Sequence, residues 1–69
     1  MNKYLSLWKY IQNEDREILK LNFSEIEQIS GIPIDHSFLT YKKQLEEYGF
    51  RVDKISMKEK TVIFRKITG

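Results

Sequence analysis

The stretch Leu21-Asn22-Phe23-Ser24-Glu25-Ile26-Glu27-Gln28-Ile29-Ser30-Gly31-Ile32-Pro33 decides how this chain folds. Ser24 is a favourable N-cap residue, because its hydroxyl accepts from a free backbone N–H of a first helical turn. Glu27 follows three positions later and completes an S-x-x-E capping box. Ile26 and Ile29 are three residues apart and share one helical face. We therefore predict a short helix over residues 25–30.

A tight turn and a second helix follow. Gly31 suits the left-handed conformation that ends a helix, and Pro33 prevents continuation. Either Asp35 or Ser37 is a suitable cap for the next helix, which we expect over residues 36–48 and which ends before a glycine. Its apolar side chains recur at helical spacing (Phe38, Tyr41, Leu45, Tyr48).

Periodicity predicts the remaining elements. A helix is expected over residues 3–12, and alternation predicts strands over 18–23, 50–56 and 61–67. Val52 and Ile55 cannot both point inward without a bulge or a bend in the strand. The expected core comprises ten side chains (Trp8, Ile11, Leu21, Phe23, Ile26, Ile29, Leu45, Val52, Val62, Phe64).

The resulting order, α-β-α-α-β-β, predicts an α+β fold, a small winged helix-turn-helix-like domain occupying residues 1–69. A different α+β packing of the same elements is the alternative. The chain has 69 residues, which corresponds to one domain with a small core.

The amino-acid composition restricts the cellular environment and the kinds of metal site that we expect for this chain. There are no cysteines, so disulfides and thiolate metal sites are excluded, and the chain suits a reducing, cytoplasmic environment. No apolar run approaches the roughly 20 residues that span a bilayer, and the N-terminus lacks a signal-peptide pattern, so no membrane partner is expected.

Charge is unevenly distributed. Residues 1–50 hold six Lys/Arg and eight Asp/Glu, a balance of −2, whereas residues 51–69 hold six Lys/Arg and two Asp/Glu, a balance of +4. Such asymmetry is typical of a chain with an anionic partner. The alternative is that basic residues keep an exposed hairpin soluble and discourage edge pairing.

The chain resembles an uncharacterised family of short bacterial domains. The family pattern is L-T-F-x-E-I-E-x-I-x-G, a Pro-containing turn, S, a helix, A-G-[WY]-x-V and V-x-F-x-R. The corresponding segments cover about two-thirds of this chain (21–31, Pro33, Ser37, 49–52, 62–65). Asn22 replaces the usual Thr, and the segment between Gly31 and Gly49 is shorter than is typical of the family and lacks the Trp-Trp pair and the basic residues that many members carry there. The family has no established function. The resemblance therefore supports the predicted fold and implies no activity.

Catalytic chemistry is not expected. His36 is the only histidine, and a metal site would need further ligands near it. Nucleophilic catalysis would need a base, a nucleophile and an orienting group, and Ser37 beside His36 is better explained as a helix cap. No phosphate-binding glycine loop is present. We expect a non-enzymatic protein without metal or cofactor.

Double-stranded DNA is the first candidate partner. The exposed face of the 36–48 helix would offer His36, Thr40 and Lys43 to a groove, with Ser37 and Gln44 nearby. The basic hairpin would place positioning contacts along the phosphates (Lys54, Lys58, Lys60).

A protein partner, or a second copy in a homodimer, is the alternative from another class. Four aromatic residues exceed what the expected core needs and would form an exposed patch (Tyr4, Tyr10, Tyr41, Phe50). One continuous positive face favours DNA, and scattered lysines beside an apolar patch favour a protein.

Overall fold

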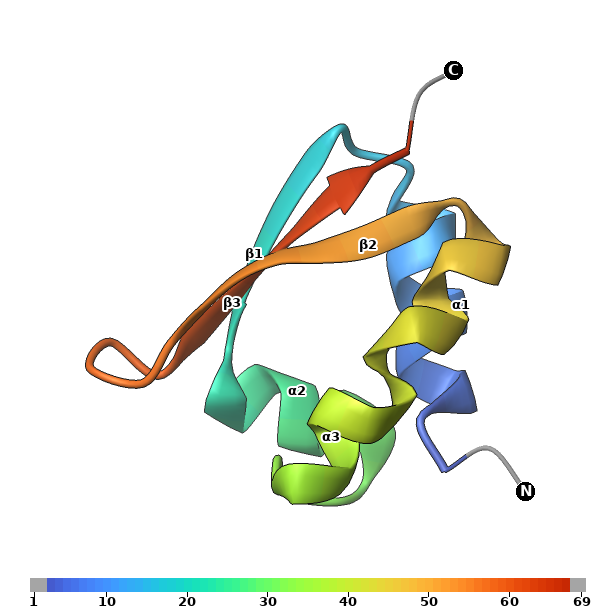
Figure 1. Ribbon diagram of the computed structural model, residues 1–69. Helices are drawn as coiled ribbons and strands as arrows, with labels where there is room; N and C mark the ends of the chain where they lie inside the picture. Colours follow the sequence, from blue (N-terminus) through green and yellow to red (C-terminus); the bar gives the residue numbers. More distant parts are fainter. Residues whose placement is uncertain (1–2, 68–69) are drawn as a thin grey trace.

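A computed structural model describes residues 3–67 and shows a small α+β domain. Figure 1 shows the helices grouped on one side of a three-stranded sheet, with a hairpin projecting beyond them. The elements follow in the order α1 (Leu5–Glu14), β1 (Ile18–Asn22), α2 (Phe23–Ser30), α3 (His36–Tyr41), the 3₁₀ helix η1 (Lys42–Tyr48), β2 (Phe50–Ser56) and β3 (Thr61–Lys66). Three helices and an antiparallel strand pair were predicted, and both are confirmed.

The sheet is antiparallel throughout, in the strand order β1-β3-β2. Val52 lies opposite Phe64 and Lys54 lies opposite Ile63, so Asp53 is an extra residue in β2. The spacing of Val52 and Ile55 predicted a bulge or a bend, and the structure has the bulge. It keeps the core side of β2 in register with β3 on both sides of Asp53.

The core fills the space between the sheet and the helices. Among residues 3–67, twelve hydrophobic side chains are buried (Tyr4, Leu7, Trp8, Ile11, Leu19, Leu21, Ile26, Phe38, Leu45, Phe50, Val62, Phe64). Seven of the ten predicted core residues are among them, whereas Phe23, Ile29 and Val52 are only partly buried.

The predicted patch of surplus aromatics is wrong for Tyr4 and Phe50, which are core residues. The ring of Tyr4 lies 5.6 Å from that of Trp8 and 5.5 Å from that of Phe38, measured between centroids. These distances suit favourable aromatic pairs. In a domain this small, large rings are needed to fill the core, and few remain for the surface.

Helix α2 begins earlier than predicted. Its N-cap is Asn22, whose side chain accepts from the backbone N–H of Glu25, and Glu25 in turn accepts from Asn22. The predicted capping box of Ser24 and Glu27 is therefore wrong. At the other end, Gly31 has φ +82° and donates its N–H to the carbonyl of Glu27 at 2.7 Å. The predicted glycine stop is confirmed.

The predicted helix 36–48 has two parts. Asp35 caps it, and the α-helical turns end at Tyr41, after which η1 continues as a 3₁₀ helix to Tyr48. At three residues per turn, residues three apart lie on one side. Leu45 and Tyr48 therefore both turn toward the interior beside β2, where Leu45 is fully buried.

Helix α1 is displaced from the predicted residues 3–12 and runs to Glu14. Asp15 ends it in the left-handed conformation, with φ +48°. The carboxylate of Asp15 pairs with Lys66 of β3. No helix within residues 3–67 combines the length and the apolar character needed to cross a bilayer.

Candidate functional site

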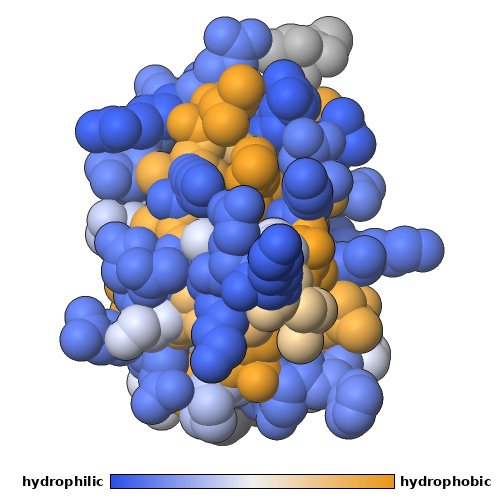
Figure 2. Space-filling model, turned by 90° about the vertical axis from the view of Figure 1, so that its left-hand side faces the viewer, coloured by the Kyte–Doolittle hydropathy of each residue, from blue (hydrophilic) through white to orange (hydrophobic). Residues whose placement is uncertain are grey.

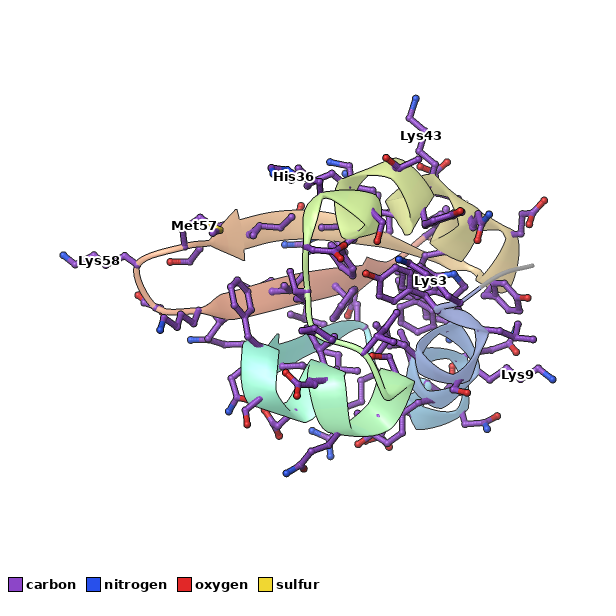
Figure 3. All side chains as sticks on the ribbon, turned by 90° about the horizontal axis from the view of Figure 1, so that it is seen from below. Lys3, Lys9, His36, Lys43, Met57 and Lys58 are labelled. Atoms are coloured by element: carbon purple, nitrogen blue, oxygen red, sulfur yellow. The ribbon has the colours of Figure 1, made fainter. Side chains whose placement is uncertain are left out.

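Three predicted site residues share the exposed side of α3 and η1. His36 begins α3, Thr40 lies one turn later, and Lys43 lies in η1; all three are exposed. Spacings of four and three residues place side chains on one side of a helix. Figure 3 shows His36 and Lys43 extending from the same side of the domain. The structure thus brings these three together.

The hairpin lysines are not gathered with them. Lys58 and Lys60 lie in the turn between β2 and β3, and Figure 3 shows Lys58 reaching beyond the hairpin tip. Lys54 lies in β2 opposite Ile63, whose neighbours Val62 and Phe64 point into the core, so Lys54 is on the outer face of the sheet. The six predicted residues therefore occupy three separate places.

The structure also gathers a second set of cations, of which the sequence analysis had singled out Lys43 alone. Lys42, Lys43 and Arg51 line a cleft of about 180 Å³ between η1 and β2, together with Glu46. Arg51 lies directly opposite Arg65 on β3. We call Lys42, Lys43, Arg51 and Arg65 the basic strip. Its members had been counted in the charge balance, but their proximity depends on the packing of η1 against β2.

The basic strip is only partly neutralised. Asp53, in the bulge, lies 3.7 Å from a guanidinium nitrogen of Arg51 and 3.4 Å from one of Arg65. Like charges directly opposite each other destabilise a sheet, so one carboxylate between two arginines offsets that repulsion. Two guanidinium groups share a single carboxylate, which leaves net positive charge on this face.

An open apolar groove lies between α3 and the β2–β3 hairpin, with a volume of about 360 Å³. Its apolar walls come from both elements, from the start of α2 and from the turn between α2 and α3 (Phe23, Ile34, Phe38, Leu39, Ile55, Met57). Leu39 is 52% exposed and Met57 is 72% exposed. Figure 2, which faces the hairpin end of the molecule, shows hydrophobic side chains at the surface among hydrophilic ones.

Asp35 and His36 form the polar part of this groove. The hydroxyl and the backbone N–H of Ser37 both donate to the Asp35 carboxylate, and they hold its pKa below the usual range. Asp35 is therefore a helix cap whose hydrogen bonds are satisfied within the domain. Away from the groove, the negative charge of Glu14 raises the pKa of Tyr10, whose hydroxyl donates to that carboxylate at 3.2 Å.

Within residues 3–67, no three His, Asp or Glu side chains come close enough together to hold a metal ion. His36, the one imidazole in the sequence, adjoins apolar groove walls and the capped Asp35. The described surfaces can therefore offer cations, or an apolar groove, to a partner.

Comparison with protein-family models, with curated proteins and with solved structures found no match to this chain. The resemblance seen in the sequence pattern accordingly remains a prediction.

Proposed function

We propose that this protein is a non-enzymatic, winged-helix-like domain that binds double-stranded DNA. In this proposal α2 and α3 form the helix-turn-helix, and the β2–β3 hairpin is the wing. Two features support the winged-helix assignment. The turn over residues 31–35 joins α2 to α3 directly, and the strand that precedes the two helices pairs with the last strand of the hairpin in the order β1-β3-β2.

The observation that carries the proposal is the basic strip beside the exposed side of α3. Lys43 belongs to both surfaces, because it lies three residues after Thr40 and lines the same cleft as Arg51. Arginine and lysine side chains beside a helix supply the phosphate contacts that position a protein on a duplex. In this proposal α3 is the helix that enters the major groove.

Roles follow from position. His36, Thr40 and Lys43 would face base edges, while Arg51, Lys54 and Arg65 would meet phosphates together with the hairpin-turn lysines, Lys58 and Lys60. Glu46 and Glu47 lie on the same 3₁₀ helix as Lys43, and their negative charges would repel the phosphates of DNA. We therefore propose binding that is mainly electrostatic, with limited sequence preference.

The test is fluorescence anisotropy on a labelled, mixed-sequence duplex at low and moderate salt. Binding that weakens steeply with salt supports the proposal, since each neutralised phosphate contributes a slope of about −0.9 in log K against log salt. No binding at low salt up to roughly 100 μM, the weak end of the non-specific range, rejects it.

A further inference from the structure

We propose that the apolar groove between α3 and the β2–β3 hairpin binds a short segment of a partner protein, one that carries a large apolar side chain flanked by carboxylates. The groove does not coincide with the basic strip: Leu39 and Met57 line the groove, whereas Lys43 and Arg51 line the cleft between η1 and β2. This inference therefore goes beyond DNA binding and does not depend on it.

The groove is built to receive an apolar side chain. Leu39 on α3 and Met57 at the end of the hairpin come from different elements and both remain largely exposed. Phe23, Ile34 and Ile55 are half-buried and adjoin the core. Exposed apolar surface that is concave and continuous with the core marks a binding site rather than scattered surface residues. The flexible methionine lets one wall adapt to the shape that enters.

The size of the groove favours a peptide segment over a second copy of the chain. Eight residues line it, whereas a stable interface between folded proteins uses about 20–30 residues on each side. Its volume of about 360 Å³ lies near the lower end of the roughly 300–1,000 Å³ seen for ligand pockets. One or two large side chains on a linear segment suit that space.

The charges around the groove favour a partner segment in which acidic residues flank the apolar one. Lys58 follows Met57, and Lys60 lies in the same turn; within residues 3–67, neither lysine forms an ion pair. The carboxylate between them, Glu59, pairs with Lys20 at 3.5 Å. Asp35, on the opposite wall, stays ionised, because the two hydrogen bonds from Ser37 stabilise its charge. The unpaired positive charge therefore lies on the hairpin side of the groove, and carboxylates that flank the apolar anchor on that side would complement it.

The experiment starts with selection of phage-displayed random linear peptides against the full chain. We expect enriched sequences to share a large apolar residue flanked by Asp or Glu. The best peptide is then synthesised with a fluorescent label, and its Kd is measured by anisotropy for wild type, Leu39→Glu and Met57→Glu. Both substitutions should weaken binding by about tenfold or more, as expected for central interface residues.

Ile18→Glu is the matched control, because Ile18 is 50% exposed on β1 and does not line the groove. It should change the Kd by less than about twofold, the scale of residues outside a hot spot. The double variant Lys58→Glu, Lys60→Glu should weaken peptide binding and reduce its salt dependence. Circular dichroism melts of each variant confirm that the fold is retained.

Three outcomes would overturn the proposal: no enriched peptide, enriched peptides without carboxylates, or equal Kd changes at Leu39, Met57 and Ile18. A fourth would assign the groove to nucleic acid instead. If Leu39→Glu and Met57→Glu weaken duplex binding while no peptide is enriched, the groove is part of the DNA surface. If peptides bind as expected while the duplex does not bind at all, the groove proposal stands and the DNA proposal fails.

Discussion

Asn22 and Glu25 cap α2 reciprocally. The side-chain oxygen of Asn22 accepts from the backbone N–H of Glu25 at 2.7 Å, and the carboxylate of Glu25 accepts from the backbone N–H of Asn22 at 2.9 Å. Two backbone donors that a helix start leaves unpaired are thereby satisfied. Because β1 ends at Asn22, this pair also marks the point where the sheet gives way to the helices.

Replacement of Asn22 by Ala should lower the free energy of unfolding by about 1 kcal/mol, the usual effect of losing an N-cap. Ser24→Ala is the control: Ser24 lies inside the first turn and is exposed, so the change should be less than about 0.5 kcal/mol. Asn22→Thr should retain most of the stability, since Thr also caps helices. Urea denaturation of the three variants measures the differences. A larger effect at Ser24 than at Asn22 would contradict this capping geometry.

Asp53→Ala should destabilise the sheet by up to about 1 kcal/mol, because Arg51 and Arg65 would then face each other without a shared carboxylate. The loss should shrink at high salt, which screens exposed charges. The matched double variant Asp53→Ala, Arg51→Ala removes the repulsion as well and should recover part of the stability. Equal stability of the single and double variants would show that the two arginines do not repel.

The carboxyl group of Asp35 should have a pKa below the usual range for an aspartate, because Ser37 donates two hydrogen bonds to the ionised form. A folded-state pKa below the unfolded one stabilises the protein above the unfolded pKa. This stabilisation is lost as pH falls through the folded pKa. Carboxyl-carbon NMR titration measures the midpoint.

Ser37→Ala should move the midpoint for Asp35 upward, toward its usual value, since the hydroxyl of Ser37 is the largest cause of the shift. Ser37 is also hydrogen-bonded to the hydroxyl of Tyr4, at 3.2 Å. Tyr4→Phe therefore serves as the control, because it removes that contact and leaves the cap intact. An unchanged midpoint in Ser37→Ala would mean that the hydroxyl does not stabilise the carboxylate.

Lys43→Ala should weaken duplex binding, reduce the salt slope by about 1 if the residue contacts a phosphate, and alter sequence preference if it contacts a base edge. Lys9→Ala is the matched control: both lysines are exposed, and Figure 3 shows Lys9 on α1, away from the Lys43 side. Anisotropy titrations over a salt series distinguish the cases. Similar losses for both variants would indicate attraction to net charge alone.

Charge reversal at both Lys58 and Lys60 should lower duplex affinity strongly and leave the fold intact, because exposed charges in a hairpin turn contribute little to stability. If each contacts one phosphate, the salt slope falls by about 1.8. The control with the same change in net charge is Lys3→Glu, Lys9→Glu on the N-terminal side of the molecule. Equal losses in the two pairs would exclude a specific role for the hairpin.

Much of the fold could be predicted because it depends on local periodicity and backbone constraints. Gly31 and Gly49 stop their helices with φ of +82° and +88°, a conformation that glycine adopts without strain. The alternation of β3 places Val62 and Phe64 in the core. A bulge or a bend in β2 followed from the three-residue spacing of Val52 and Ile55, since side chains alternate strictly along a regular strand.

The first residue of α2 could not be predicted from the local sequence. Asn22 and Ser24 are both good capping residues, and the choice between them depends on where β1 ends. That end is fixed by β3: Asn22 lies opposite Thr61, and the backbone N–H of Phe23 donates to the carbonyl of Lys60 at 2.8 Å. Pairing between segments nearly forty residues apart in the sequence therefore determines the helix cap.

By itself the sequence determined which segments become helices and strands, because propensity, capping and side-chain period act over a few neighbouring residues. It also determined the excess of positive charge after residue 50. Only the tertiary structure decided how those charges and apolar groups meet. The packing of η1 against β2 brings Lys43 to Arg51, and the hairpin brings Met57 to the same groove as Leu39. Such neighbours follow from three-dimensional packing, which a one-dimensional pattern does not encode.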